Sequence, residues 1–365
     1  MMKLETITIG QQGNANPLEL RLFHFEGHKS DQSAFIQANV HGAEIQGNAV
    51  IYHILVTLKA NPDIVRGNIT LLPQANPLAA ITKMGTWTLG RFNSVTGDNW
   101  NRLYKDIFAN QSLDQFAKKD FDKEQFKAYL EKAIDQKLFA LKEYGENENA
   151  FLNLHLQKIA ARADYVLDLH TGPIACDYLY VAEYLTEKSK DLNFPHHLII
   201  PNEFGMAMDE ASFMPWVHLK KALENSGKTY DIPFESYTLE LGSEEVINTK
   251  LALKQAAKIM HYLLKREIIS ENPLEEHLIL ETPKACLLSD YKTYYAPKGG
   301  LVEYHAKPGQ EVKKGEILFS ILSFEDPERL LEEHKAKKDC LIINHTTSGN
   351  IRKGMELYQV MENYQ

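Results

Sequence analysis

SAFIQANVHGAE, residues 33–44, is the stretch that decides the fold of this chain. Its first eight residues are mainly apolar, as a buried strand requires, Gly42 breaks the strand, and a helix is expected to begin near Glu44. A second apolar segment, YVLDLHTG at residues 165–172, also ends at a glycine. Ligands of α/β proteins bind where strands end and helices begin, so the two segments predict one binding site.

The two segments carry three side chains that can bind a metal ion. His41 and Glu44 belong to the first segment, and His170 belongs to the second, where Asp168 shares its face because side chains in a strand alternate. Two imidazoles and one carboxylate leave zinc a fourth position for water, as in catalytic zinc sites. A His-x-x-Glu pair arises often by chance among 14 histidines, but Asp168 adds a partner that can orient His170. The pattern therefore predicts a metallohydrolase.

The strand-like segments of the first 282 residues alternate with helical ones, which predicts an α/β sheet with helices on both faces. These strand-like segments are residues 18–25, 35–40, 69–72, 166–169, 179–181, 198–200 and 237–241. Between about residues 105 and 163 the pattern is helical, with apolar residues on one face at positions 126, 130, 134, 138 and 141. We interpret this part as a helical insertion. Its charged face fits a solvated surface, and its position between the two metal-ligand segments also allows a lid or a subunit contact.

After residue 283 the sequence changes to short strands separated by Gly and Pro. Residues 312–322 realign with residues 351–361, so that Gly315 matches Gly354 and apolar residues match apolar residues. This internal repeat predicts a small β-barrel sandwich and a division into a catalytic α/β domain, residues 1–282, and a β domain, residues 283–365. The β domain resembles biotinyl and lipoyl carrier domains, but neither turn has the Met-Lys-Met or Asp-Lys-Ala sequence that presents a modified lysine. A structural role or a role at the rim of the site is therefore expected.

Composition narrows the class of protein. The chain has 365 residues, 44% of them hydrophobic, and a formal net charge of -9 without a basic stripe, so neither nucleic acid nor an anionic membrane is expected as a partner. No apolar segment has the length of a membrane span, and residues 1–9 lack the apolar stretch of a signal peptide. Three widely spaced cysteines fit reduced thiols. These features predict a cytoplasmic protein, with a homo-oligomer as one possibility.

Two further segments carry polar residues suited to catalysis. Glu240 interrupts the apolar end of a strand in TLELG, residues 238–242, where it is either a solvent-facing side chain or a general base beside a metal-bound water. The loop of residues 90–104 contains Arg91, Asn101 and Arg102 among turn-forming residues. Arginine forks suit carboxylates and oxyanions, although a surface turn with Arg102 paired to a nearby aspartate is the simpler interpretation of the loop alone.

The order of these motifs resembles that of the succinylglutamate desuccinylase and aspartoacylase family, a branch of the zinc metallocarboxypeptidase superfamily. The motifs are His41-x-x-Glu44, Asn101-Arg102, Asp168-Leu-His170-Thr and Glu240. The resemblance covers about residues 30 to 265. It implies a mixed sheet flanked by helices, like that of zinc carboxypeptidases.

The resemblance also implies a role for each site residue. His41, Glu44 and His170 would hold one Zn²⁺ per chain, and Glu240 would act as the base that activates water. Arg91 would polarise the scissile carbonyl and stabilise its oxyanion. The pair Asn101 and Arg102 would bind the carboxylate of the substrate.

The expected activity is hydrolysis of a linear amide, in which an N-acyl amino acid or a related small amide yields a carboxylate and a free amine. No arginine is evident that would bind a second carboxylate, so the acyl group stays open. Asp177, Tyr178 and Tyr180 suit either an amine or aromatic group of the substrate or an ordinary strand. Two alternatives remain: a metallocarboxypeptidase acting on short peptides, and a non-catalytic binding protein that retains the zinc fold.

Overall fold

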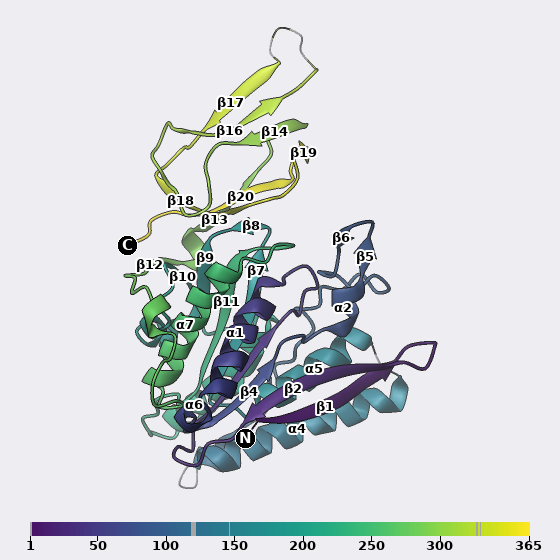
Figure 1. Cartoon of the computed structure of the whole chain (residues 1–365), viewed down its shortest axis with the longest axis vertical. Helices are drawn as coiled ribbons and strands as arrows, with labels where there is room; N and C mark the ends of the chain where they lie inside the picture. The colour runs from purple at the N-terminus through teal and green to yellow at the C-terminus, as the bar shows by residue number, and fades with distance from the viewer. Residues whose placement is uncertain (1, 118–121, 146, 326–327, 329) are drawn as a thin grey trace.

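The computed structural model describes residues 2–117, 122–145, 147–325, 328 and 330–365. Its main feature is a nine-stranded sheet with the strand order β1-β2-β4-β3-β7-β11-β9-β10-β12 (Figure 1). The strands are β1 Met2–Gln11, β2 Pro17–Phe25, β3 Ser33–Ala38, β4 Asn68–Leu72, β7 Tyr165–Gly172, β9 Asp177–Ala182, β10 His196–Ile200, β11 Glu235–Ser243 and β12 Lys284–Leu287. Every strand-like segment expected in the first 282 residues lies in or overlaps one of these strands.

The centre of the sheet is parallel, and its edges are mixed. Strands β4, β3, β7 and β11 run parallel to one another, whereas β9 pairs antiparallel with β11 and β2 pairs antiparallel with β4. The central strands β3 and β7 are buried along almost their whole length, which explains why their sequences are apolar runs and not alternating patterns. Parallel pairing places the carboxyl ends of β3 and β7 side by side.

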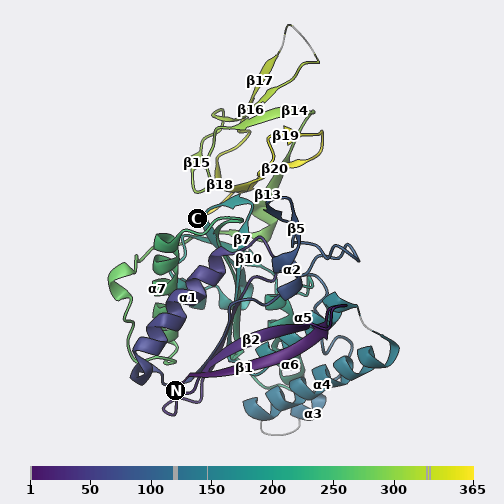
Figure 2. The same cartoon turned by 45° about the vertical axis from the view of Figure 1, so that its right-hand side comes forward.

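Helices cover both faces of this sheet. In Figure 2, α1 and α7 lie on one side of the strands, and α4, α5 and α6 lie on the other. The helices are α1 Gln46–Ala60, α2 Pro77–Ile81, α3 Asp114–Ala117, α4 Lys123–Tyr144, α5 Glu148–Ala160, α6 Met208–Asn225 and α7 Thr249–Lys265. Short 3₁₀ turns span Pro62–Ile64, Glu183–Leu185, Lys188–Leu192, Glu275–His277 and Leu288–Asp290. No helix among the described residues is long and apolar enough to cross a membrane.

The helical insertion consists of α3, α4 and α5. The periodic face of α4 is directed inward: Phe126, Leu130, Ile134 and Leu138 are buried, and Leu141 packs against the same core from a half-buried position. The apolar period of the sequence thus predicted the buried face of α4.

Gly47, in the first turn of α1, lets this helix approach the sheet closely. A Cβ atom at Gly47 would lie 2.9 Å from the Cβ of Ala38 in β3 and 2.9 Å from the Cβ of Leu169 in β7. The close approach fixes the start of α1 above the ends of both strands. It therefore fixes the loop of residues 39–45, which joins β3 to α1.

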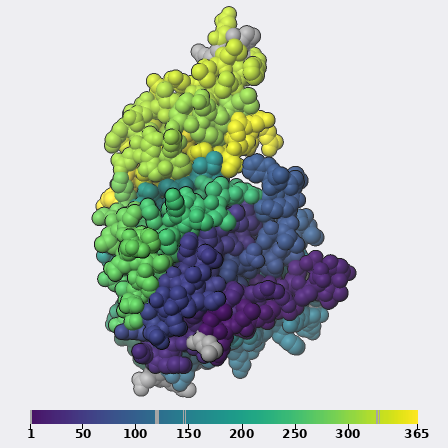
Figure 3. Space-filling view, in the orientation of Figure 1, coloured from purple at the N-terminus to yellow at the C-terminus, as the bar shows by residue number. Residues whose placement is uncertain are grey.

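The C-terminal residues form two smaller sheets, which lie above the large sheet in Figure 1 and form the yellow-green part of Figure 3. One contains β13 Tyr291–Tyr295, β15 Glu311–Val312, β18 Cys340–His345 and β20 Glu356–Met361. The other contains β14 Gly300–Tyr304, β16 Ile317–Leu322, β17 Leu331–Lys335 and β19 Asn350–Ile351. The sequence repeat corresponds to β15-turn-β16 and β19-turn-β20, whose turns contain Gly315 (φ 93°) and Gly354 (φ 83°). The predicted fold class is confirmed.

The large and small sheets are joined at β8, Ile174–Ala175, which pairs with β18. The loop that carries β8 follows directly after β7, so the C-terminal sheets rest beside the end of the strand that carries His170. Strand β12 belongs to the large sheet although it follows residue 283. The division of the chain into domains at residue 283 therefore stays a prediction.

Candidate active site

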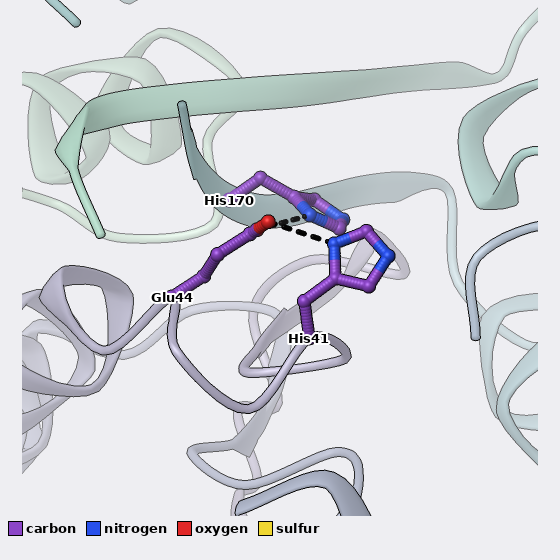
Figure 4. A group of neighbouring side chains, drawn as sticks. All are labelled: His41, Glu44 and His170. Atoms are coloured by element: carbon purple, nitrogen blue, oxygen red, sulfur yellow. Dashed lines mark hydrogen bonds and ion pairs between the residues drawn. The ribbon is translucent and has the colours of Figure 1, made fainter. Parts of the chain in front are cut away.

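The structure brings His41, Glu44 and His170 together at the ends of β3 and β7. The Nδ1 atoms of His41 and His170 each lie 2.8 Å from one oxygen of the Glu44 carboxylate (Figure 4). All three side chains are buried. The strand ends and the glycine at position 42 predicted this meeting, because parallel strands place their carboxyl ends at the same edge of a sheet.

The far nitrogens of the two imidazoles are held by other side chains. The carboxylate of Asp168 accepts a hydrogen bond from His170 Nε2 at 2.8 Å, and its second oxygen accepts one from Gln37 Nε2 at 2.9 Å. His41 Nε2 lies 2.9 Å from Asn99 Oδ1. These contacts fix both rings with Nδ1 directed at Glu44, as partners of metal-binding histidines commonly do.

The electrostatics of the three residues are coupled. Burial acts to raise the pKa of Glu44, but the charges of His41 and His170 outweigh it and hold this pKa well below its usual range. Burial acts to lower the pKa of His170, but Asp168 and Glu44 outweigh it and raise this pKa well above its usual range. The centre is thus arranged to hold a cation, which is a proton on His170 or a metal ion.

The donor set fits a divalent metal ion. One ligand atom from each of the three residues lies within 4.8 Å of the others, which is close enough for all three to bind one metal ion. Two neutral imidazole nitrogens and a carboxylate oxygen are ligands that zinc prefers. A backbone N–H, that of Thr171, donates to Glu44 Oε2 at 3.2 Å and helps hold the carboxylate in place.

Strand register aligns further side chains with this centre. His170 in β7 lies opposite Glu240 in β11, and Glu240 lies opposite Tyr178 in β9. Two residues before Glu240, Thr238 in β11 lies between its strand partners Asp168 in β7 and Tyr180 in β9. Residues directly opposite one another share a face of the sheet, so these side chains belong to the face that carries His170.

Glu240 has the properties of a general base. Its Oε2 atom is buried and has no hydrogen-bond partner among the described residues. Burial, assisted by the charge of Glu44, raises the pKa of Glu240 to about 7. A carboxyl group with a pKa near neutrality exchanges protons readily at physiological pH. From its sequence position at the end of a strand, a solvent-facing side chain was the alternative interpretation.

A cavity of about 130 Å³ unites the candidate residues. The seven residues to which the sequence resemblance gave a metal, catalytic or substrate role all line it, together with six others. The thirteen residues are His41, Glu44, Arg91, Asn101, Arg102, His170, Tyr180, Ile200, Ala207, Asp209, Glu210, Thr238 and Glu240.

The loop of residues 90–104 supplies three of these side chains. Arg91 Nη1 lies 3.2 Å from Glu44 Oε1, and Arg102 Nη1 donates to the carbonyl oxygen of Asn101 at 2.7 Å. The side chain of Asn101 is buried, and no group in the described part of the chain hydrogen-bonds to its Oδ1 atom. Asp106 pairs with His218 at 2.8 Å. Much of the loop is exposed, yet Arg91, Asn101 and Arg102 all line the cavity.

Several residues of the site were not predicted from the sequence. Asp209 stands at the start of α6, where burial, assisted by Glu210, raises its pKa to about 7. The sequence signal was present, because α6 follows β10 in the same strand-then-helix order that drew attention to Glu44. Asn99, which holds His41, lies in an irregular loop and had no comparable signal.

A model of the succinylglutamate desuccinylase/aspartoacylase catalytic domain matches residues 30–266. The chain belongs to the succinylglutamate desuccinylase/aspartoacylase family. This is a family of hydrolytic deacylases that act on small acyl-amino acids, so the resemblance seen in the motif order is confirmed and supports a deacylase role.

Solved structures extend the similarity over the whole chain. A family protein from Shewanella frigidimarina is 38% identical with a TM-score of 0.91, covering 100% of this chain and 98% of its own. One from Shewanella amazonensis is 35% identical with a TM-score of 0.85, covering 100% and 99%. A third, from Rhodobacter sphaeroides, shares the fold at 17% identity and a TM-score of 0.68, covering 100% and 96%. No match was found among curated proteins.

Proposed function

We propose that this family member is a zinc-dependent amidohydrolase that removes the acyl group from an N-acyl amino acid. The observation that carries the proposal is the cavity that His41, Glu44 and His170 share with Glu240, whose carboxyl Oε2 atom is buried. Three metal ligands alone would fit a non-catalytic binding protein as well as a hydrolase. A nearby carboxyl with a pKa of about 7 adds the proton transfer that amide hydrolysis needs.

His41, Glu44 and His170 are the residues that would hold the zinc ion. Zinc in such a site supplies a Lewis acid, which favours the ionisation of water and polarises a carbonyl group. Glu240 takes the proton from the attacking water and then donates it to the leaving nitrogen. Its unpartnered Oε2 atom leaves it free for both transfers.

The remaining polar residues of the cavity position the substrate. Arg91, whose guanidinium lies at Glu44, stabilises the negative charge that develops on the scissile carbonyl oxygen. Asn101 and Arg102 bind the carboxylate of the amino acid, since an arginine fork and an amide offer N–H donors to its oxygens.

The test is a panel of N-acyl amino acids and dipeptides offered to the zinc-loaded protein, with release of free amine as the measure. We expect cleavage of N-acyl amino acids in preference to dipeptides, and a loss of about 10²- to 10⁴-fold in kcat for Glu240→Gln, the range typical of a removed general base. The preference for dipeptides over N-acyl amino acids would assign the site to a carboxypeptidase. Failure to cleave any member, with zinc bound at one equivalent, would contradict catalysis.

A matched control separates catalysis from folding. Glu303 lies in β14 of the C-terminal sheets, away from the cavity lining, so Glu303→Gln makes the same chemical change outside the site. We expect this variant to keep the wild-type rate. Equal losses for Glu240→Gln and Glu303→Gln would show that the effect does not come from the cavity.

A further inference from the structure

Large apolar side chains are exposed on two separate segments of the chain, residues 84–92 and 246–247. They expose between 47% and 68% of their surface. We call them the apolar rim, and they are Met84, Trp87, Leu89, Phe92, Val246 and Ile247. Met84 and Trp87 lie directly opposite each other in the β-hairpin of residues 83–88, and large exposed apolar patches mark binding surfaces.

Backbone hydrogen bonds join both segments of the apolar rim to the loop that carries His41 and Glu44. The carbonyl oxygen of Gly90 accepts a hydrogen bond from the N–H of Gly42 at 2.9 Å, and the N–H of Glu245 donates to the carbonyl oxygen of Ala43 at 2.8 Å. Gly42 and Ala43 lie between His41 and Glu44 in the sequence. The two segments also bond to each other, since the N–H of Thr88 donates to Glu245 Oε1.

The fold therefore places the rim beside the cavity. Arg91 lines the cavity, Phe92 follows it directly, and Leu89 lies two residues before it. Val246 lies two residues after Glu244, whose N–H donates to the carbonyl oxygen of Gly172 at 2.9 Å. Figure 1 shows β5 Lys83–Met84 and β6 Trp87–Thr88 projecting at the end of the large sheet on which the C-terminal sheets lie. That is the end at which β7 carries His170.

The cavity itself is too small and too polar to account for a whole substrate. Its volume of about 130 Å³ falls below the roughly 300–1,000 Å³ usual for small-molecule sites. Ile200 and Ala207 are its aliphatic lining residues, and the other eleven have charged or hydrogen-bonding side chains. A substrate with its amide and carboxylate in the cavity extends any larger group outward, onto the rim.

We propose that the apolar rim binds the acyl chain of the substrate, so that the preferred substrates are N-acyl amino acids with apolar acyl chains longer than acetyl. This inference rests on the proposed function. The acyl chain is the group assigned to the rim because Phe92 is next to Arg91 in the sequence and Leu89 lies two residues before it. In the proposed function Arg91 contacts the scissile carbonyl. The amino acid carboxylate lies at Asn101 and Arg102, inside the cavity.

The first test is a ladder of N-acetyl, N-butanoyl, N-hexanoyl and N-octanoyl derivatives of one amino acid. Burying a methylene contributes about 0.8 kcal/mol at most, so we expect kcat/KM to rise about two- to fourfold per added methylene until the rim is covered. A parallel series keeps the acetyl group and enlarges the amino acid side chain instead. A flat acyl ladder, or a rise confined to the side-chain series, would overturn the assignment.

Variants of the rim give the second test. Trp87→Ala is expected to reduce the octanoyl-to-acetyl ratio of kcat/KM by about tenfold or less, in line with the few methylenes that one exposed side chain covers. The control is Phe139→Ala, which removes an aromatic side chain that is 73% exposed on α4, and it should leave the ratio unchanged. If Trp87→Ala alters the sedimentation coefficient but not the ratio, the rim is a contact between copies of the chain and the proposal is wrong.

A binding measurement that needs no catalysis tests this inference separately from the proposed function. Trp100 and Trp216 are 2% and 1% exposed, whereas Trp87 is 62% exposed, so a blue shift of tryptophan emission reports burial of Trp87. We expect octanoate to produce the shift and acetate not to produce it. A shift with octanoate in a protein that cleaves no amide would contradict the proposed function alone, and amide cleavage without a shift would contradict the rim alone.

Discussion

The substitution of Asp168 should have a well-defined effect, because each of its two carboxylate oxygens accepts a hydrogen bond from a buried donor. One oxygen accepts from His170 Nε2 at 2.8 Å and the other from Gln37 Nε2 at 2.9 Å, and Asp168 is completely buried. The substitution Asp168→Asn leaves one oxygen for the two donors. Either His170 or Gln37 then faces an N–H group instead of an acceptor.

The size of the effect follows from the hydrogen bond that is lost. A hydrogen bond to a charged group contributes about 1.5–3 kcal/mol, and 1.4 kcal/mol corresponds to a factor of ten. The Asp168 bond keeps the proton of His170 on Nε2 and leaves Nδ1 free for a metal ion, so its loss acts directly on metal binding. We expect the affinity for zinc to fall about 10- to 100-fold, the usual effect of removing a residue that orients a metal-binding histidine.

The assay is competition for zinc between the protein and a chromogenic chelator of known affinity, at constant pH and ionic strength. The control is Asp164→Asn, which alters a buried aspartate just before β7 that pairs with Lys123 and Lys127 at 2.8 and 2.6 Å. This control should destabilise the fold without changing the zinc affinity of the folded protein by more than twofold. Unchanged affinity in Asp168→Asn, or an equal fall in both variants, would refute the reasoning.

Two predictions concern stability. Burial raises the pKa of Asp177 from 3.8 to about 6, so its charged form destabilises the fold as pH rises from about 4 to above 6. Asp177→Asn should therefore raise the free energy of unfolding above pH 6 by about 3 kcal/mol or less and have no effect below pH 4, as urea titrations at pH 4 and pH 8 would show. Gly47→Ala should destabilise the protein by about 1–3 kcal/mol, because its Cβ would lie 2.9 Å from those of Ala38 and Leu169. Gly13→Ala is the control, since a Cβ there meets no atom within 4 Å and the change should stay within about 0.5 kcal/mol.

The parts of the site that the sequence predicted are those governed by local pattern and strand period. The apolar run before His41, its ending at Gly42, and the alternation that puts Asp168 with His170 all depend on neighbours within a few residues. The structure has β3 at Ser33–Ala38 and β7 at Tyr165–Gly172, close to the predicted segments. The repeat of the C-terminal sheets was visible for the same reason, since its turns need glycine at positive φ.

The parts that could not be predicted depend on pairing between distant strands. Tyr180 lines the cavity because β9 pairs with β11 in a register that sets Tyr180 opposite Thr238. No local pattern encodes that register, so an ordinary strand was the simpler interpretation of residues 177–180. Asp209 reaches the cavity because α6 packs against β7 and β11, and this packing is likewise a property of the whole fold.

Zinc titration of the metal-stripped protein, with release of free amine from an N-acyl amino acid as the readout, tests the central claim most directly. Activity should rise linearly with added zinc and saturate at one equivalent per chain. The His170→Ala variant should neither bind one equivalent of zinc nor release amine. Full activity in the stripped protein with a chelator present, or saturation in His170→Ala like that of the wild type, would contradict the assignment of His41, Glu44 and His170 as the metal ligands of a deacylase.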